Sequence, residues 1–269
     1  MDIKCAVCQL KILSTKDENL KKARIMIKNA AANNADIAIL PEIFNSPYDI
    51  HLLTRYAEEY PGPTSDLLSS LSKKLGIYII GGSICEKENN SYYNTSYSFD
   101  KNGSLIGKHR KLHMFDVDIK NKIRFKESDV ISCGNKTTVF DTEFCRIGVL
   151  ICYDMRFPEL IRKMASDGAK IVIAPASFNM VTGPAHWEVT ARARAIDNQI
   201  YFIAASPARN ISASYVSYGH SLIVNPWGEI VAEADENECI LYGNIDLDLI
   251  NKIREELPLL KHLKPDLYR

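Results

Sequence analysis

The sequence predicts an α/β fold in which helices cover β-sheets, and two observations support this prediction. Short apolar, β-branched segments alternate along the chain with longer segments that have helical periodicity. Such alternation is typical of layered α/β domains. The apolar segments of the second half of the chain also repeat those of the first half in the same order.

Segments with the composition of strands are spread over the whole chain. They are residues 3–8, 37–40, 77–80, 104–107, 146–152, 171–174, 200–205 and 221–224. Helices are expected between them. The first begins after residues 15–18, Thr-Lys-Asp-Glu, which have the spacing of a capping box, and apolar residues follow at helical intervals. Further helices are expected from about Pro158, and from Pro184 towards Asn198.

An internal repeat relates the two halves of the chain. Residues 3–8 resemble 147–152, residues 35–45 resemble 169–179, and residues 77–83 resemble 200–206. Apolar strands resemble one another by chance, so each pair alone is weak evidence. Three pairs in the same order nevertheless favour two related β-α-β halves, whose layers can pack into one core.

No Ser/Gly-rich linker or block of charge divides the chain, so we expect a single domain over residues 1–269. Residues 88–97, rich in Asn, Ser and Tyr, are expected to form a loop that leads into a strand. The segment from about 255 to 269 contains Pro258 and Pro265, and it is expected to form an extended C-terminal tail.

The composition excludes several classes of partner. The 269 residues contain 33 Lys plus Arg and 33 Asp plus Glu, so the chain lacks the excess positive charge that nucleic-acid binding requires. No apolar run reaches the roughly 18 residues of a membrane-spanning helix. The charged N-terminus argues against a secretion signal, and an odd number of cysteines, seven, argues against a disulfide framework. We therefore expect a protein of the reducing cytoplasm.

Cys152 ends a predicted strand shortly before a predicted helix. Open α/β sheets bind ligands beyond the carboxyl ends of their strands, where such a corner exposes a side chain and aims backbone N–H groups at it. Cys152 is therefore a candidate nucleophile. A buried, unreactive cysteine is the alternative, since free cysteines often behave as small core residues.

Glu42 occupies a similar corner in the first half, directly after the apolar segment 37–40 and Pro41. Its counterpart in the repeat is Ala176. Burial penalises a carboxylate and raises its pKa unless a partner compensates, so a carboxylate at this place needs a reason. A general base is one reason, and an ordinary cap or solvated loop residue is the alternative.

Lys111 lies in the basic run 108–113, which follows a predicted strand. Strand alternation places Lys111 on the same side as His109 and His113, so that this lysine can face inward, although a solvated basic face is the alternative. Glu127 is a weaker candidate from its pattern, because most loop carboxylates lie on the surface.

Other chemistries lack their signatures. Cys5 and Cys8 form a lone C-x-x-C within a predicted strand, so their side chains point to opposite faces, and a second pair of zinc ligands is missing. The sequence also contains no H-E-x-x-H, G-x-S-x-G, Walker A or spaced G-x-G-x-x-G motif. We therefore expect neither a metal site nor a nucleotide cofactor.

The segments around these candidates resemble the nitrilase superfamily, the carbon-nitrogen hydrolases. The resemblance covers nearly the whole chain and rests on Pro41 with Glu42, on residues 109–113, and on residues 151–159, Ile-Cys-Tyr-Asp-Met-Arg-Phe-Pro-Glu. Residues 44–48, 114–118, 182–188, 206–209 and 225–229 resemble the omega-amidase branch in particular. The resemblance implies a four-layer α-β-β-α sandwich, which agrees with two related halves, and a homodimer or larger homo-oligomer.

The resemblance also implies a role for each candidate. Cys152 would be the nucleophile and Glu42 the general base. Lys111 would stabilise the tetrahedral intermediate together with the backbone N–H of Tyr153, and Glu127 would be a second carboxylate that positions the others. A neighbouring lysine lowers the pKa of a thiol and burial raises that of a carboxylate, so Cys152 and Glu42 are expected to titrate near neutrality. This chemistry requires no metal or organic cofactor.

The omega-amidase resemblance further implies hydrolysis of the terminal amide of a short dicarboxylate monoamide, such as 2-oxoglutaramate or 2-oxosuccinamate, to the 2-oxo acid and ammonia. Such a substrate carries a carboxylate, so a second cation besides Lys111 is expected. Our hypothesis is Arg156, because its planar fork fits a carboxylate. A structural ion pair of Arg156 with Asp154 or Glu159 is the alternative.

The sequence leaves other functions open. A deaminated glutathione amidase, an N-carbamoyl amidohydrolase or a nitrile hydrolase of the same superfamily would share the chemistry. A catalytically silent binding module would not need Glu42, Lys111 and Cys152 intact. A redox-sensing thiol protein would need a reactive Cys152 but not Glu42.

Overall fold

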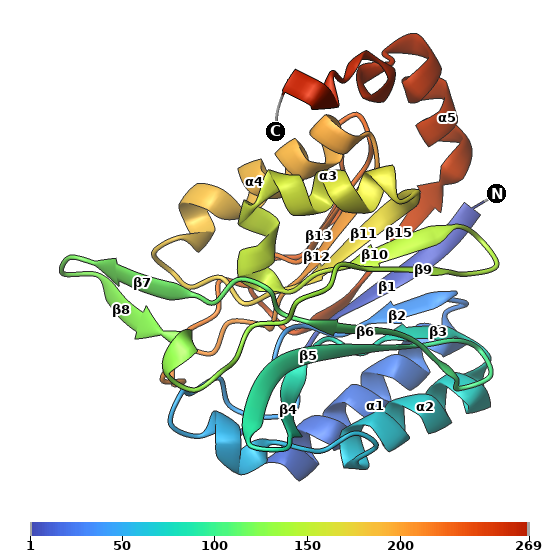
Figure 1. The fold of residues 1–269 in the computed structure, drawn as a ribbon. Helices are drawn as coiled ribbons and strands as arrows, with labels where there is room; N and C mark the ends of the chain where they lie inside the picture. The colour runs from blue at the N-terminus through green and yellow to red at the C-terminus, as the bar shows by residue number, and fades with distance from the viewer. Residues whose placement is uncertain (1, 268–269) are drawn as a thin grey trace.

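The first of two main sheets comes largely from the N-terminal half of the chain (Figure 1). The structure is a computed structural model and describes residues 2–267. β1 (Asp2–Gln9), β2 (Ile37–Ile39) and β3 (Tyr78–Ile80) are parallel neighbours. The antiparallel strands of this sheet are β15 (Cys239–Asp246) beside β1, β5 (Ser91–Phe99) beside β3, and β4 (Ile84–Glu88) and β6 (Leu105–Arg110), which both pair with β5.

The second sheet repeats this plan with the C-terminal half. β10 (Arg146–Val149), β11 (Ala169–Pro175) and β12 (Tyr201–Ala205) are parallel neighbours. The antiparallel strands are β9 (Thr138–Asp141) beside β10, β13 (Leu222–Val224) beside β12, and β14 (Ile230–Glu233) beside β13. The predicted relation between two β-α-β halves is therefore present in the topology.

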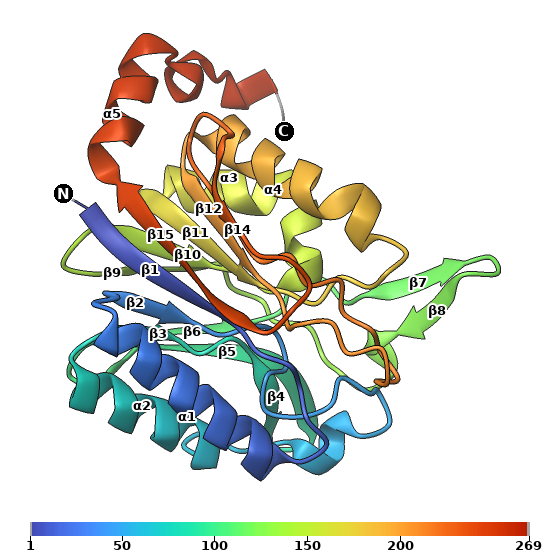
Figure 2. The same ribbon diagram turned by 180° about the vertical axis from the view of Figure 1, so that it is seen from behind.

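Helices cover the outer face of each sheet. α1 (Lys16–Ala32) and α2 (Pro63–Leu75) lie on the first sheet, and α3 (Pro158–Ser166) and α4 (Gly183–Asn198) lie on the second (Figures 1 and 2). The inner faces of the sheets share one buried cluster, in which Ile37 and Ile39 pack with Ile171 and Ile173. Full burial of such a side chain stabilises the folded state by about 1.5–3 kcal/mol relative to leaving it exposed. The predicted α-β-β-α sandwich is confirmed.

The start of α1 follows the predicted capping box. The hydroxyl of Thr15 accepts a hydrogen bond from Glu18 N at 3.4 Å and donates to Glu18 Oε2 at 2.6 Å. The exchange satisfies an N–H group that the first turn of a helix leaves without a partner.

The register of the sheets corrects one part of the predicted repeat. Ile37 pairs with Cys5, whereas its counterpart Ile171 pairs with Ile147. Cys5 therefore corresponds to Ile147, and Leu10 rather than Cys8 corresponds to Cys152. A shift of two residues keeps every side chain on the same face of its strand, so the apolar pattern did not reveal the error.

Three segments differ from the sequence prediction. The strand predicted over 146–152 ends at Val149; the backbone is still extended at Ile151, and at Cys152 it turns with a φ of 48°, which does not continue a strand. Residues 88–97 are not a loop but the tip of the β4–β5 hairpin together with most of β5. The C-terminal segment is not extended: α5 (Leu247–Glu256) is followed by the 3₁₀ turns η4 (Leu259–His262) and η5 (Pro265–Leu267).

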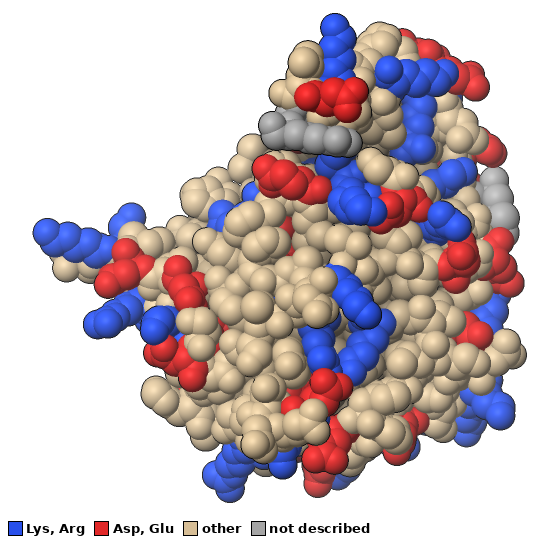
Figure 3. All heavy atoms as spheres, viewed as in Figure 1, with Lys and Arg blue, Asp and Glu red and all other residues tan. Residues whose placement is uncertain are grey.

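A separate hairpin, β7 (Asp116–Ile119) and β8 (Ile123–Lys126), projects from the side of the sandwich (Figures 1 and 2). Acidic and basic side chains are interspersed over the face shown in Figure 3, with wide uncharged areas between them. Within residues 2–267, no helix has the length and apolar character needed to cross a bilayer.

Candidate active site

The turn after β10 presents Cys152 at the end of the second sheet. Ile151 is extended, Cys152 is in the left-handed region with a φ of 48°, and the 3₁₀ turn η3 (Cys152–Arg156) leads into α3. This backbone conformation is unfavourable for residues other than glycine, and such strain is typical of functional sites. The Cys152 thiol is buried and accepts a hydrogen bond from the backbone N–H of Ser177, which follows β11.

Glu42 lies at the end of β2, at a corner that also contains a left-handed residue. Ile43 has a φ of 47°, and its N–H donates to Ser83 Oγ at 3.0 Å. This contact fixes the turn that brings the Glu42 carboxylate under the Cys152 thiol. Oε2 of Glu42 accepts no hydrogen bond from a nitrogen or oxygen donor among residues 2–267, and the carboxylate interacts with the Cys152 thiol, so Oε2 is the oxygen free to take a proton.

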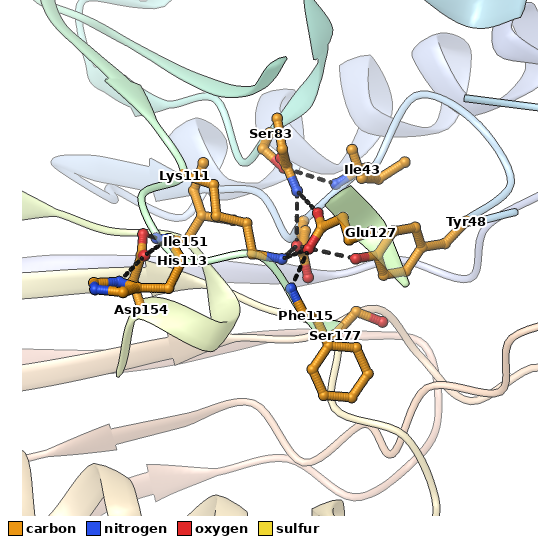
Figure 4. Close-up of polar contacts among 12 residues, drawn as sticks. Ile43, Tyr48, Ser83, Lys111, His113, Phe115, Glu127, Ile151, Asp154 and Ser177 are labelled. Carbon is orange, nitrogen blue, oxygen red and sulfur yellow. Dashed lines mark hydrogen bonds and ion pairs between the residues drawn. The ribbon is translucent and has the colours of Figure 1, made fainter. Parts of the chain in front are cut away.

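Lys111 joins two carboxylates in a fully buried cluster (Figure 4). Its Nζ lies 3.0 Å from Glu42 Oε1 and 2.7 Å from Glu127 Oε2, and the exposed fraction of all three side chains is 0%. Lys111 directly follows β6, and Glu127 opens the 3₁₀ turn η2 (Glu127–Asp129) after β8. Strand alternation predicted the inward direction of Lys111, and His109, two residues earlier, is buried as well.

Two further groups donate hydrogen bonds to the carboxylates of the cluster, and neither was predicted from the sequence. Asn94 Nδ2 donates to Glu42 Oε1 at 2.9 Å and to Glu127 Oε1 at 3.3 Å. Phe115 N donates to Glu127 Oε2 at 2.8 Å. Asn94 carried no signal in the sequence, because residues 88–97 were expected to form a loop, where asparagine is common.

The charges of the cluster set the protonation of its members. Burial alone lowers the pKa of Lys111, but Glu127 and Glu42 outweigh it and raise the pKa well above its usual value. Burial raises the pKa of Glu42 despite Lys111. Lys111 is therefore a fixed cation, while Glu42 binds a proton more readily than an exposed glutamate.

The expectation of a thiol that titrates near neutrality was wrong. Burial and then the Glu42 carboxylate raise the pKa of Cys152 well above its usual value, and Lys111 only partly offsets them. A thiolate beside two carboxylates would place three negative charges around one lysine. The resting thiol therefore keeps its proton more firmly than an exposed cysteine does.

A cavity of about 370 Å³ opens on Glu42 and Ser177. This size is at the lower end of the ~300–1,000 Å³ typical of small-molecule sites. Its wall includes Tyr48 and Tyr215, whose rings lie 4.8 Å apart, and Phe125 of β8 contacts both rings at 5.8 Å. The cavity therefore fits a small substrate with a planar end between aromatic side chains.

The remaining two predicted site residues lie on η3. Tyr153 is the second residue of this turn, and the first N–H groups of a helical turn have no acceptor inside it, so this N–H is suited to an oxyanion. Arg156 packs its guanidinium 4.6 Å from the centre of the Phe178 ring and contacts His186 Nδ1 at 3.1 Å. Within residues 2–267 it has no ion pair with Asp154 or Glu159, and it is not among the residues that line the cavity.

No group of three or more His, Cys, Asp or Glu side chains in the described part of the chain is arranged to hold a metal ion. The cluster instead offers a thiol, a base with a free oxygen, and a buried cation within one contiguous site. These are the components of covalent acyl transfer.

Comparisons with known proteins agree with this arrangement. Residues 4–255 match the profile of the family described as "Carbon-nitrogen hydrolase". The omega-amidase NIT2-B of Xenopus laevis is 48% identical over 98% of this chain and 95% of its own, and the human omega-amidase NIT2 is 47% identical over the same shares. The crystal structure of Saccharomyces cerevisiae Nit3, a member of branch 10 of the nitrilase superfamily, is 42% identical, with a TM-score of 0.89 over 97% of this chain and 96% of that chain.

Proposed function

The chain belongs to the carbon-nitrogen hydrolase family, and on that premise we propose that it hydrolyses the terminal amide of short dicarboxylate monoamides such as 2-oxoglutaramate and 2-oxosuccinamate. The products are the 2-oxo acid and ammonia. The observation that carries the proposal is the buried Glu42–Lys111–Glu127 cluster beside Cys152. The relatives named omega-amidase support hydrolysis of a terminal amide.

The first step is attack by sulfur on the amide carbon. Glu42 Oε2 takes the thiol proton as Cys152 Sγ bonds to the carbonyl carbon, and the electrons of the C=O bond move to oxygen. Lys111 Nζ and Tyr153 N–H donate to that oxyanion, and one such donor typically contributes about 3–4 kcal/mol to transition-state stabilisation. Proton transfer during attack removes the need for a free thiolate.

The second step releases ammonia and the third releases the acid. The C–N bond breaks as the protonated Glu42 gives its proton to the leaving nitrogen, which leaves a thioester on Cys152. Glu42 then accepts a proton from water as the water oxygen attacks the thioester. Collapse of the second tetrahedral intermediate breaks the C–S bond, and the thiol regains the proton from Glu42.

Glu127 acts through its neighbours in this scheme. It accepts from Lys111, Asn94 and the Phe115 N–H, so both of its oxygens are occupied and neither is available as a base. Its charge keeps Lys111 protonated, and its contacts fix the direction of the ammonium group. It is therefore a positioning carboxylate.

We propose that Arg156 binds the carboxylate of the substrate. It lies on the same turn as the nucleophile, and its cation has no acidic partner among the described residues. Arg156→Lys should raise KM for a carboxylate-bearing amide about tenfold or more with little change in kcat. Arg192→Lys, on the exposed pair with Glu188, is the matched control. An unchanged KM in Arg156→Lys would discard this role.

The substrate is tested by ammonia release from 2-oxoglutaramate, succinamate, glutamine and deaminated glutathione, with Cys152→Ala alongside. Activity on the short acids that is lost in Cys152→Ala supports the proposal. Preference for deaminated glutathione would keep the mechanism and change the substrate. Release from none of them would favour an N-carbamoyl substrate, a nitrile or a silent binding module.

We also propose that the chain works in the cytoplasm as a homodimer or larger homo-oligomer. The exposed apolar side chains Val189 and Ile196 of α4 and the nearby Trp227 support self-association. Light scattering of the purified protein measures the assembly directly.

A further inference from the structure

Asp154 is a buried carboxylate that the scheme above does not use. It lies two residues after Cys152 in η3 and has no exposed surface. Its two oxygens accept hydrogen bonds from three backbone N–H groups and two histidine rings. These are Leu112 N at 3.1 Å, His113 N at 2.9 Å, Ile151 N at 3.1 Å, His109 Nε2 at 3.0 Å and His113 Nδ1 at 2.8 Å.

These donors come from the two segments that carry the proposed nucleophile and the proposed oxyanion donor. Leu112 and His113 directly follow Lys111, and Ile151 directly precedes Cys152. The segments are about forty residues apart in the chain and belong to different sheets. Figure 4 shows His113, Asp154 and Ile151 together on one side of Lys111, with Glu127 and Tyr48 on the other.

Asp154 also closes the strained turn at the nucleophile. Asp154 N donates to Ile151 O at 3.0 Å, and Ile151 N donates back to Asp154 Oδ2 at 3.1 Å. This reciprocal pair spans Cys152, whose φ of 48° needs support from its surroundings. The same carboxylate thus fixes the conformation of one segment and the distance to the other.

The groups that face Asp154 keep it ionised. Burial alone would raise its pKa, but the hydrogen bonds from His109 and His113 hold the pKa well below its usual range. His109 is itself held by Thr138 Oγ1 at 3.1 Å, and Thr138 Oγ1 donates to Lys108 O at 3.2 Å. An acceptor-only group with this many donors has no neutral substitute of equal capacity.

We propose that Asp154 is a positioning residue that sets the distance between Lys111 and Cys152 by clamping the backbone beside each of them. The proposal rests on the proposed roles of Cys152 and Lys111. Among the described residues, the polar contacts of the Asp154 carboxylate are all with backbone and histidine groups of these two segments, so we expect it to act on the geometry of attack and not on substrate affinity. A misplacement of about 1 Å between reacting groups costs about 10²-fold in rate.

The test compares Asp154→Asn with Glu58→Gln. Glu58 is also a buried carboxylate that accepts a backbone N–H, from Thr64 at 2.8 Å, but it contacts neither Lys111 nor Cys152. Asp154→Asn is expected to lower kcat for 2-oxoglutaramate about 10²-fold with KM within threefold, and to slow alkylation of Cys152 by iodoacetamide at least tenfold at every pH. Glu58→Gln is expected to lower Tm but to leave kcat and the alkylation rate within twofold.

His113→Phe covers the case in which Asp154→Asn does not fold. The phenyl ring keeps the stack on Phe157, where the ring centres lie 3.6 Å apart, and removes only the 2.8 Å contact to Asp154. A fall in kcat of about fivefold to tenfold with unchanged KM is expected. Wild-type kcat and alkylation rates in both variants, or equal losses in Glu58→Gln, would overturn the proposal. Alkylation needs no substrate, so it tests Asp154 independently of the proposed reaction. If the wild type reacts with iodoacetamide but hydrolyses no tested amide, the proposed substrate is wrong and the proposed role of Asp154 is still decided by the alkylation rates.

Discussion

The two halves of the molecule have the same scaffold but different side chains at equivalent strand ends. At the end of the first parallel strand, Leu10 fills the place in the first half that Cys152 takes in the second. At the end of the next strand the order is reversed, with Glu42 in the first half and Ala176 in the second. Each half therefore has one of these two corners with a candidate reactive side chain and one with an apolar side chain, although the corner at Ala176 also supplies the Ser177 N–H that contacts the Cys152 thiol. The site forms where the two reactive corners face each other.

A second comparison, between Cys152 and Cys8, shows that burial is not what distinguishes the reactive thiol. Burial raises the pKa of Cys8 to about 12, and it also raises that of Cys152. Only Cys152 has a carboxylate with a free oxygen and a buried lysine beside it. The two thiols therefore differ in their charged neighbours, Glu42 and Lys111, which lie beside Cys152 and come from the first half of the chain.

The largest effect is expected from loss of the buried cation. Lys111→Met removes an oxyanion donor and leaves Glu42 and Glu127 without their counter-charge. Ammonia release should fall about 10²–10³-fold, and the free energy of unfolding should fall by about 3–5 kcal/mol. Lys108→Met, on the half-exposed pair with Glu86, is the control and should stay within threefold in rate. Wild-type activity in Lys111→Met would show that the Lys111 cation is not needed for turnover.

The next effect is expected in the pH dependence of kcat/KM. A general base must be ionised, and the raised pKa of Glu42 means that it stays protonated where an exposed glutamate, with a pKa of about 4.3, is already ionised. The acid limb of kcat/KM should therefore lie above pH 4.3, with activity lost as the pH falls through the pKa of Glu42. A pH–rate profile of the wild type measures it, after far-UV circular dichroism confirms the fold at each pH. Full activity at or below pH 4.3 would contradict the assignment.

A smaller effect is expected from Asn94, which links both carboxylates of the cluster. Asn94→Leu removes two hydrogen bonds to charged groups, each worth about 1.5–3 kcal/mol, and lets Glu42 and Glu127 move. We expect kcat to fall about 10- to 100-fold, measured by ammonia release. The same change at Asn102, an exposed turn residue, should have no such effect. Equal rates for Asn94→Leu and the wild type would remove Asn94 from the site.

The smallest effect is expected at Cys8. Cys8→Ala creates a small cavity in the core and should lower Tm by a few degrees. Its kcat should match that of the wild type within twofold, because no group of the site contacts Cys8. A large loss of activity with unchanged Tm would mean that the two thiols are less different than their surroundings indicate.

The sequence predicted the layers, the parallel strands of both halves, and the cluster residues Glu42, Lys111 and Cys152. Apolar periodicity and the resemblance at strand ends are local signals, and they are sufficient for these features. Asn94 and Asp154 were missed because their roles depend on which strands pair and on which turns meet across the sheets. The titration of Cys152 was misjudged for a similar reason: the charge around this buried thiol depends on Glu42, Lys111 and Glu127, which come from three separate segments.

The most direct test of the central claim is the alkylation rate of individual cysteines in the wild type and in Glu42→Gln. Iodoacetamide and peptide mass spectrometry distinguish Cys152 from the buried Cys8 and from the exposed Cys133. Wild-type activity should be lost in step with modification of Cys152, and this modification should slow at least about 10²-fold in Glu42→Gln while Cys133 reacts as before. Equal rates at Cys152 in the two proteins would contradict the claim that the first half supplies the base for a nucleophile in the second.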